Sequence, residues 1–421
     1  MARMETAQSA PQALGGITAI ELPFLDPMKF YAAPMAAKAF ADLGAEVIKI
    51  EPPNGSAERE EGPFRMGRRN RETSGLHLYL NTNKFGVTLD LERERGRELL
   101  FRMLAGADIV FNSNPPALAE RLGLDWRTIV ARFPELIVAS LTWFGADSPY
   151  RDLRGCDLIA THLSSVGYET PANQVTDLGK EPPLKMAGRQ SDYMCGLTGA
   201  TGAMMALMNQ RRFGGGQHVD VSQWLSMVNT NRPNIGVYFH ESADAPFYLR
   251  LFTREKKALP WLYPCKDGWV SFSPLTDRFW AGTKKLMNYP EWAESELFAT
   301  RELRQLNVDA LEAGLIAWLS DHTRREVFEA AQAEHIPCFP VNSAAEVAGN
   351  EQYAARGFFA SVAHPEAGVV RMPGAPYQFS RTPWRIVRAA PRLGEHNRKI
   401  YLDRLEIGER DFRALQDEGV I

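Results

Sequence analysis

Apolar and polar positions alternate along the first 145 residues in a way that separates short strands from longer helices. Runs rich in β-branched and other apolar residues predict five strands, at 17–22, 46–50, 87–91, 108–111 and 136–141. Helical periodicity lies between several of these runs, at about 34–43, 93–105 and 125–132. Strands that alternate with helices predict a parallel sheet with helices on both faces, so we expect a doubly wound, Rossmann-like α/β domain.

A longer helical pattern follows at 192–212 and carries glycines at 196, 199 and 202 on one face. Because these positions have no side chain, they permit close approach of a neighbouring element. Three further glycines at 214–216 separate this helix from an alternating run at 217–221, which predicts another strand. A phosphate-binding loop has the opposite order, strand before helix, so we interpret these glycines as a helix C-cap and turn.

The pattern changes between about 230 and 340, where aromatic residues and mixed periodicity replace the regular alternation. Trp261, Trp269 and Phe272 indicate short antiparallel strands, and helices are predicted at about 277–287, 309–320 and 323–333. We interpret this stretch as a smaller α+β domain. The predicted division is a large α/β domain made of residues 1–228 and 345–421, with the small domain at 229–344.

Composition excludes several classes of protein without naming one. The chain has 421 residues with 45% hydrophobic and 24% charged residues and a net charge of -3, which argues against disorder and against bulk attraction to nucleic acid or an anionic membrane. No run approaches the length of a transmembrane helix, and residues 1–13 lack the apolar core of a signal peptide. We therefore expect a cytoplasmic protein.

The sequence contains no motif for metal binding and none for binding of a nicotinamide dinucleotide. The four cysteines lie far apart, with no CxxC pair and no histidine at metal-ligand spacing, so we expect reduced thiols and no metal site. The glycine-rich dinucleotide motif is also missing after the first predicted strand, where Phe24, Leu25 and Asp26 stand instead. A nicotinamide-dependent oxidoreductase is therefore disfavoured.

Asp192 is the strongest candidate for chemistry. It stands at the start of the long predicted helix, where the helix dipole and free N–H groups favour an ionised carboxylate. An ionised carboxylate beside small apolar residues can act as a nucleophile toward an acyl group. Plain N-capping is the alternative, since Asp is a preferred cap at any helix start, and the local pattern by itself favours that role.

Several segments taken together resemble the class III CoA-transferases, the family of formyl-CoA and carnitine CoA-transferases. The N-terminal signature of that family is similar to LGAEVIKIEP at 43–52. Further segments keep the order of the family along almost the whole chain: NTNK at 81–84, LDL at 89–91, RLGL at 121–124, SD at 191–192, GGQHVDV at 215–221, YPCKDG at 263–268 and LGEH at 393–396.

The resemblance implies transfer of CoA from an acyl-CoA donor to a free, small carboxylic acid, with no tightly bound cofactor. Asp192 falls where the family carries its nucleophilic aspartate. Its carboxylate would attack the donor thioester to give a mixed anhydride, and the CoA thiolate would then form an aspartyl-CoA thioester. The acceptor acid would reverse these steps, with water excluded because both intermediates hydrolyse.

The family's contacts to CoA carry over unevenly. The resemblance implies CoA-binding roles for Tyr31, Ala32, Leu89, Asp90, Leu91, Ser113, Asn114, Arg121 and Arg154. The chain departs from the family at Pro52, where some members have a basic residue, and at 112–115, where Asn-Ser-Asn-Pro replaces a Glu-Asn-Phe run. The glycine-rich lid of some members is also missing, and 240–262 offers Phe247, Tyr248 and Trp261 instead.

Racemases that act on 2-methylacyl-CoA share this fold and are the alternative function. They need two acid/base groups on opposite faces of the substrate, and their histidine lies in a Gly-His-Asp motif. The matching positions here read Gly155, Cys156 and Asp157, which favours the transferase. The family also implies an interlocked homodimer. Neither acid is identified, because aromatic residues such as Trp143 and Tyr150 could line an acyl pocket or belong to the core.

Overall fold

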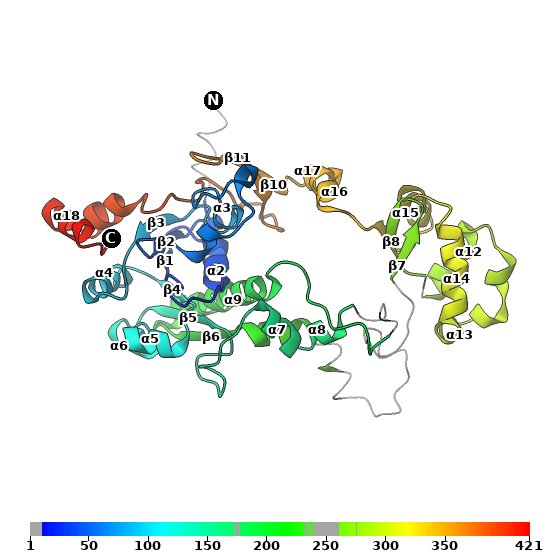
Figure 1. Ribbon diagram of the computed structural model, residues 1–421, viewed down its shortest axis with the longest axis horizontal. Coiled ribbons are helices and arrows are strands. Elements are labelled where there is room, and N and C mark those ends of the chain that lie inside the picture. The colour runs from blue at the N-terminus through cyan, green and yellow to red at the C-terminus, as the bar shows by residue number, and fades with distance from the viewer. Residues whose placement is uncertain are drawn as a thin grey trace. The chain divides into compact units, whose positions relative to one another are not determined.

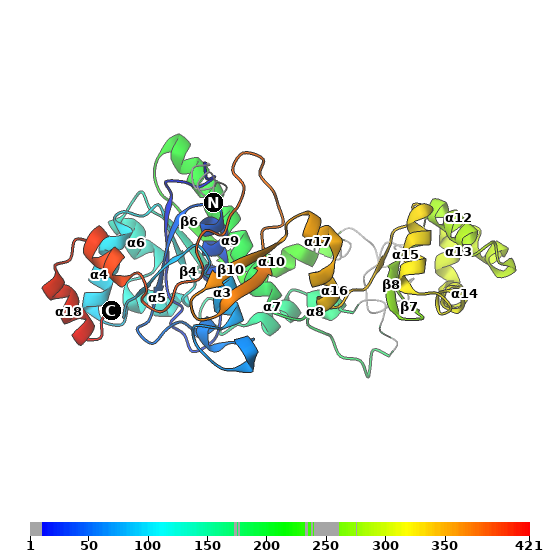
Figure 2. The ribbon, with the colours of Figure 1, turned by 90° about the horizontal axis from the view of Figure 1, so that it is seen from above.

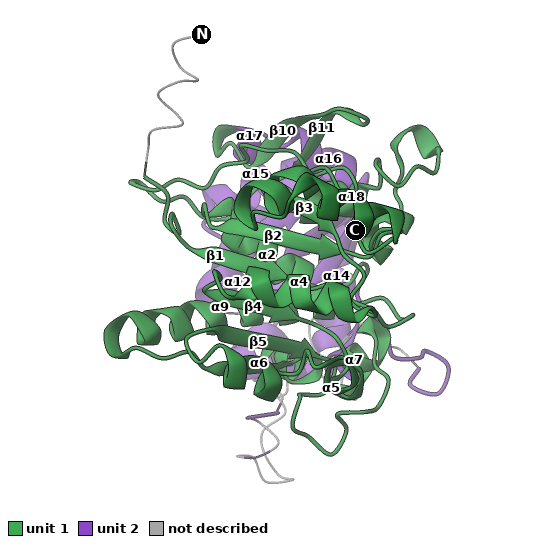
Figure 3. Cartoon of the chain, turned by 90° about the vertical axis from the view of Figure 1, so that its left-hand side faces the viewer, with its two compact units in different colours: residues 1–164, 187–230, 355–421 green, residues 165–186, 231–354 purple. Residues whose placement is uncertain are grey.

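The computed structural model describes residues 11–171, 175, 177–231, 235, 236, 239, 261–274 and 276–421. The chain forms two compact units, coloured separately in Figure 3. Unit 1 is discontinuous and comprises Met1–Ser164, Ala187–Thr230 and Ala355–Ile421. Unit 2 comprises Ser165–Met186 and Asn231–Ala354.

Unit 1 is built on a six-stranded sheet of order β3-β2-β1-β4-β5-β6, in which every neighbouring pair is parallel. Figure 3 shows the strands stacked in this order from β3 to β5. The predicted doubly wound α/β fold is thereby confirmed. The strands are β1 (Thr18–Glu21), β2 (Glu46–Glu51), β3 (Phe85–Thr88), β4 (Ile109–Asn112), β5 (Ile137–Thr142) and β6 (His218–Ser222).

Successive residues of these strands enter two different cores, because side chains alternate between the faces of a sheet. Ala19, Val47 and Ile109 pack on one face with helices α2 (Ala32–Asp42) and α9 (Gln190–Phe213). Figure 1 shows these two helices next to each other. The next residue of each strand, Ile20, Ile48 or Val110, packs on the other face with α4 (Glu94–Leu104) and α18 (Glu409–Asp417). Figure 2 shows α18 beside α4, although they lie far apart in the sequence.

The third strand ends earlier than predicted. The sequence indicates a strand at 87–91, whereas the ladder with β2 runs from Phe85 to Thr88. Leu89 and Leu91 lie past the end of the strand but are buried in the second core, so apolar character continues beyond the hydrogen-bonded ladder. Burial rather than strand pairing explains the apolar pattern there.

Glycines of α9 bring this helix unusually close to its neighbours, as the sequence predicts. A Cβ added at Gly196 would lie 2.7 Å from the carbonyl oxygen of Ala32 in α2, and one at Gly199 would lie 2.5 Å from the Leu141 side chain in β5. Such distances exclude any larger residue without displacement of the backbone or side chain. The first turns of α2 and α9 therefore lie side by side.

The predicted turn after α9 is also present. Gly214 and Gly215 have φ angles of 73° and 76°, in the left-handed region that favours glycine. A Cβ at Gly216 would lie 2.3 Å from the carbonyl oxygen of Leu136. These three glycines serve the return of the chain from α9 to β6.

Shorter elements complete unit 1: η1 (Ala57–Glu60), η2 (Arg65–Gly67), α3 (Gly75–Leu80), α5 (Pro116–Leu122), α6 (Trp126–Arg132), α7 (Asp157–Leu163), α10 (Gln223–Val228), β10 (Phe359–His364), β11 (Gly368–Pro373) and the π-helical turn η8 (Lys399–Arg404). The short helix η4 (Asn229–Asn231) adjoins the boundary between the units. Strands β10 and β11 form an antiparallel pair. Among the described residues, no helix combines the length and apolar character needed to cross a bilayer.

Unit 2 contains the short antiparallel strands that its aromatic residues indicate. β7 (Leu262–Cys265), β8 (Gly268–Phe272) and β9 (Cys338–Pro340) form one sheet, and Tyr263 and Phe272 pack in the core beneath it. Its helices are α8 (Val166–Glu169), α12 (Asp277–Leu286), η6 (Glu291–Glu294), η7 (Glu296–Phe298), α13 (Arg301–Leu306), α14 (Val308–Leu319), α15 (Arg324–Ala333) and α16 (Ala344–Gly349), with α17 (Glu351–Ala355) at the boundary.

Candidate active site at the carboxyl edge of the sheet

The strand order of unit 1 contains a topological switch point between β1 and β4. From β1 the chain adds β2 and β3 on one side and then returns to add β4 on the other side. In open parallel sheets, ligands bind in the crevice outside the carboxyl ends of the two strands at such a point. Here β1 leads into a loop at 22–31, and β4 leads into Ser113 and Asn114.

Asp192 lies at this point, in the first turn of α9. Its carboxylate is 1% exposed, and its Oδ2 accepts a hydrogen bond of 3.2 Å from the backbone N–H of Tyr31. Its Oδ1 accepts one of 2.7 Å from Nε2 of Gln223 at the start of α10. The N-cap position of α9 belongs to Arg189, so the capping interpretation of Asp192 is wrong. The carboxylate instead joins three elements of the fold.

Burial changes the protonation of this carboxylate. Loss of solvent raises the pKa of Asp192 to about 7, and the nearby carboxylates of Asp157 and Glu61 contribute to this rise. The guanidinium of Arg189 and the N–H of Tyr31 oppose the rise without cancelling it. The expectation that the helix start favours the ionised form is therefore wrong, because loss of solvent is the largest influence on the pKa of this carboxylate and raises it. Near neutral pH, Asp192 is present in both forms.

A small group of charges surrounds Asp192. Nη1 of Arg189 lies 3.9 Å from Oδ2 of Asp192, while its Nη2 donates to both oxygens of Glu61 at 2.8 and 3.0 Å. Nζ of Lys29 lies 2.7 Å from the same Glu61 carboxylate. These two cations hold the pKa of Glu61 below its ordinary value, against the effect of burial. The guanidinium of Arg189 also lies 4.8 Å from the centroid of the Tyr31 ring.

Five of the residues expected to bind CoA hold the loop that follows β1 or lie next to it. Tyr31 ends this loop at Asp192, and Ala32, the first residue of α2, is buried against α9. Ser113 Oγ accepts a hydrogen bond of 3.0 Å from the backbone N–H of Ala33. The structure therefore brings Tyr31, Ala32 and Ser113 together where the loop enters α2, and of these three Tyr31 contacts Asp192.

Asn114 and Arg154 hold the middle of the same loop. Asn114 Oδ1 accepts from the backbone N–H of Leu25 at 2.8 Å, and its Nδ2 donates to the carbonyl oxygen of Pro23 at 2.8 Å. Arg154 Nη1 donates to the Asp26 carboxylate at 2.8 and 3.0 Å. The Arg154 side chain is 64% exposed, so its other guanidinium nitrogens face solvent or a ligand.

The remaining predicted contacts lie elsewhere on the same edge. Leu89 and Leu91 are buried in the core, and the Asp90 carboxylate accepts from the backbone N–H of Glu92 at 2.9 Å. Arg121, near the end of α5, is 62% exposed and lies 3.9 Å from Glu92. Within the described chain, none of these four predicted residues shares the hydrogen bonds around Asp192.

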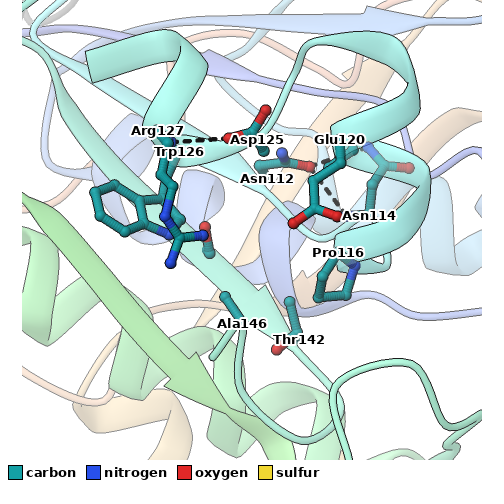
Figure 4. A pocket seen from close by; sticks show the side chains of 11 residues that line it. Asn112, Asn114, Pro116, Glu120, Asp125, Trp126, Arg127, Thr142 and Ala146 are labelled. Carbon is teal, nitrogen blue, oxygen red and sulfur yellow. Dashed lines mark hydrogen bonds between the residues drawn. The ribbon is translucent and has the colours of Figure 1, made fainter. Parts of the chain in front are cut away.

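A shallow hollow, open to solvent, lies at the carboxyl ends of β4 and β5 (Figure 4). Asn114 lines it on one side, so this residue connects the loop after β1 with the hollow. The ring of Trp126 lines another side and stacks on His218, with 4.5 Å between ring centroids. The full lining is Asn112, Asn114, Pro116, Ala119, Glu120, Asp125, Trp126, Arg127, Ser140, Thr142 and Ala146.

The aromatic residues considered for an acyl pocket have different roles. Trp143 is buried in the core of unit 1 beside Phe24 and Phe30, and Tyr150 is exposed and stacks on Trp224. Trp261 packs against the core of unit 2. Phe247 and Tyr248 lie outside the described residues.

Gln223 and Arg189 contact Asp192, although no motif in the sequence indicates a role for either residue. Gln223 lies two residues past the predicted strand at 217–221, directly after β6, and a polar residue close to the strand end was the only available signal. In the described part of the chain, no group of three or more His, Cys, Asp or Glu side chains has the arrangement of a metal site.

Comparisons with known proteins show the family of this chain. Residues 21–397 match the family model described as CoA-transferase family III. The succinyl-CoA–L-malate CoA-transferase alpha subunit of Chloroflexus aurantiacus is 28% identical over 98% of this chain and 96% of its own. The formyl-CoA:oxalate CoA-transferase of Streptomyces avermitilis is 27% identical over 94% of this chain and 98% of its own. A crystal structure of a CAIB/BAIF family protein from Brucella suis matches with a TM-score of 0.77 and 26% identity, covering 93% of this chain and 99% of the other.

Proposed function

The chain belongs to CoA-transferase family III, and we propose that it transfers CoA from an acyl-CoA donor to a free carboxylic acid through covalent intermediates on Asp192. The observation that carries the proposal is the position of this carboxylate. It is buried at the switch point of the sheet, and hydrogen bonds from Tyr31 and Gln223 hold its two oxygens. A nucleophile needs such fixed orientation toward the reacting carbonyl.

In the proposed reaction, the ionised carboxylate of Asp192 attacks the thioester carbonyl of the donor. A mixed anhydride forms and CoA leaves as a thiolate. The thiolate then attacks Cγ of Asp192, which releases the donor acid and leaves an aspartyl-CoA thioester. The acceptor carboxylate attacks the same Cγ, and the steps run in reverse to give the new acyl-CoA. Burial of Asp192 supports this route, because water would hydrolyse both intermediates.

We propose that CoA binds along the carboxyl edge of the sheet. Tyr31, Ala32, Ser113, Asn114 and Arg154 surround or hold the loop after β1, and the hollow beside Asn114 continues from it. Leu89, Asp90, Leu91 and Arg121 remain proposed contacts farther along the same edge. The exposed guanidinium groups of Arg121 and Arg154 have the charge and geometry to bind phosphates.

The proposed partners are an acyl-CoA and a small carboxylic acid. We propose neither nucleic acid nor a membrane as a partner, and we propose the cytoplasm as the location. The relatives named above act on succinyl-CoA with L-malate and on formyl-CoA with oxalate. Arg189 places positive charge 3.9 Å from Asp192, which suits an anionic acceptor. No cofactor beyond the CoA substrate is required by the proposed steps.

We also propose a homodimer. One side of α9 exposes Leu197, Met205 and Met208, whereas most apolar residues of unit 1 are buried. Leu158 of α7 and Leu225 of α10 are exposed as well. Rows of exposed large apolar side chains mark interaction surfaces, and a two-fold dimer is the commonest assembly. Light scattering at micromolar concentration would contradict the proposal if it reported only a monomer.

Asp192→Ala tests the proposed function directly. We expect loss of CoA exchange between succinyl-CoA and a panel of free acids, read by mass spectrometry, with unchanged folding by circular dichroism. Asp152→Ala, at an exposed carboxylate of unit 1, is the matched control and should retain exchange. Hydroxylamine should trap an acyl group on wild type and not on Asp192→Ala. Full activity of Asp192→Ala would exclude the mechanism, and solvent deuterium entering the α-carbon of a branched acyl-CoA without exchange would favour the racemase.

A further inference from the structure

Gln223 contacts the carboxylate of Asp192 from a position that is completely buried. It is the first residue of α10, and its exposed fraction is 0%. The amide nitrogen Nε2 donates to Oδ1 of Asp192 at 2.7 Å and to Oγ of Ser191 at 2.8 Å. Both protons of the amide are therefore committed, one of them to an oxygen of the proposed nucleophile.

A chain of hydrogen bonds determines which way this amide faces. Oδ1 of Asp157 accepts from the backbone N–H of Ser191 at 2.9 Å and from its hydroxyl at 2.6 Å. A serine hydroxyl has a single proton, so once Asp157 accepts it, Oγ of Ser191 can only accept from Gln223. The carboxylate of Asp157 thus acts through Ser191 to turn the N–H groups of Gln223 toward Asp192.

The opposite orientation of the amide would bring its carbonyl oxygen against two acceptors. The observed orientation leaves Oε1 of Gln223 buried without a hydrogen-bond partner among the described residues. An unpaired buried acceptor destabilises a folded protein. The fold tolerates the unpaired Oε1 and keeps the N–H donor of Gln223 on Asp192. An unsatisfied buried polar atom of this kind often has a functional explanation.

We propose that the Gln223 amide stabilises negative charge on Oδ1 of Asp192 while a nucleophile attacks Cγ, and that Oδ2 carries the acyl group. This inference rests on the proposed function of Asp192 as nucleophile. In the step, the CoA sulfur bonds to Cγ, the carbonyl electron pair moves to Oδ1, and Gln223 donates to the oxyanion. The pair then returns as the Cγ–Oδ2 bond breaks, and the donor acid leaves as its carboxylate.

The two hydrogen bonds suit this division of roles. The Gln223 bond to Oδ1 is 2.7 Å, whereas the Tyr31 bond to Oδ2 is 3.2 Å. Once acylated, Oδ2 loses its negative charge, while Oδ1 gains charge at each attack on Cγ. The shorter, charge-assisted bond therefore lies on the oxygen whose charge rises in the transition state, where a fixed donor is most effective.

Gln223→Leu tests the inference, because it keeps the volume and removes the donor. We expect kcat to fall about 10²- to 10³-fold, as for loss of one oxyanion donor. We also expect the acid limb of kcat/KM to move to higher pH, since the ionised carboxylate loses a hydrogen bond. In a single turnover with succinyl-CoA, intact-protein mass spectrometry should show the acyl adduct accumulating before the CoA adduct, because attack on Cγ is slowed and the first attack is not.

Two further variants separate this role from a structural one. Gln210→Leu removes a half-buried glutamine of α9 whose amide donates to the backbone carbonyl of Glu135, away from Asp192, and it should behave as wild type. Ser191→Ala releases the amide of Gln223 and should give a smaller, 3- to 10-fold loss of kcat with the limb shifted in the same direction. If Gln223→Leu does not fold, Ser191→Ala tests the proposed role of Gln223 in its place.

The inference is overturned if Gln223→Leu has the wild-type kcat, or if kcat falls with neither a shifted limb nor an accumulated acyl adduct. The same outcomes with Ser191→Ala would overturn it when Gln223→Leu is unfolded. Exchange by Asp192→Ala would instead refute the proposed function itself, so the two failures are distinguishable.

Discussion

Tyr31 and Asp192 lie 161 residues apart in the chain, yet the backbone N–H of Tyr31 donates directly to the Asp192 carboxylate. The contact exists because α2 and α9 pack with almost no space between them. Gly196 faces the carbonyl oxygen of Ala32 one turn beyond Asp192. The predictions below follow from this contact, from the burial that accompanies it and from the charges around it.

The first prediction concerns the pH dependence of catalysis. Only the ionised carboxylate of Asp192 is a nucleophile, and burial raises its pKa to about 7. We therefore expect kcat/KM to rise about tenfold per pH unit below 7 and to level off above it. Initial rates with succinyl-CoA from pH 5 to 9 would measure this limb. A limb near pH 4 would show that the carboxylate is ionised throughout and contradict the prediction.

The second prediction concerns stability. The pKa of Asp192 is higher in the folded chain than its ordinary value of 3.8, so the folded state binds the proton more tightly. The stabilisation from this group is present at low pH and is lost as pH rises toward 7. Asp192→Asn does not titrate, so its free energy of unfolding relative to wild type should increase by about 2 kcal/mol between pH 5 and 8. Urea unfolding at both values measures the difference, and equal values would contradict the prediction.

Gly196→Ala should separate the two helices. The new Cβ would lie 2.7 Å from the carbonyl oxygen of Ala32 and 2.7 Å from Cβ of Met35, so the backbones must move apart. We expect a loss of about 1–3 kcal/mol in unfolding free energy. A fall in kcat should accompany it, because the Tyr31–Asp192 bond lengthens. Gly106→Ala is the control, since its Cβ would meet no atom closer than 3.9 Å, and a matching loss of kcat there would contradict the argument.

Replacement of Arg189 should move the acid limb of the pH dependence of kcat/KM, and the size of the shift should depend on the residue that replaces it. Its guanidinium lowers the pKa of Asp192, so Arg189→Met should shift the limb to higher pH. Arg189→Lys keeps the charge but loses the paired hydrogen bonds to Glu61, so its shift should be smaller. The two pH profiles measure the series. Identical limbs in wild type and Arg189→Met would show that this cation does not act on Asp192.

Much of the large unit is predictable from the sequence because its signals are local. The alternation of apolar runs with helices determines a parallel doubly wound sheet, and the glycines at 196 and 199 indicate close packing before the neighbour is known. The order of short motifs indicates the family, and the resemblance predicts that Asp192 is the nucleophile. Each of these signals depends on a few consecutive residues, and the family match confirms the identification.

Tertiary structure alone decided the state and surroundings of Asp192. A helix start predicts an ionised carboxylate, whereas burial beneath Tyr31 and Gln223 raises its pKa to about 7. Gln223 and Asp157 lie in segments distant from Asp192 in sequence, and only the fold brings their polar atoms into one chain of hydrogen bonds. Desolvation and hydrogen bonding depend on neighbours from the whole unit, whereas strand and helix patterns depend on residues next to one another.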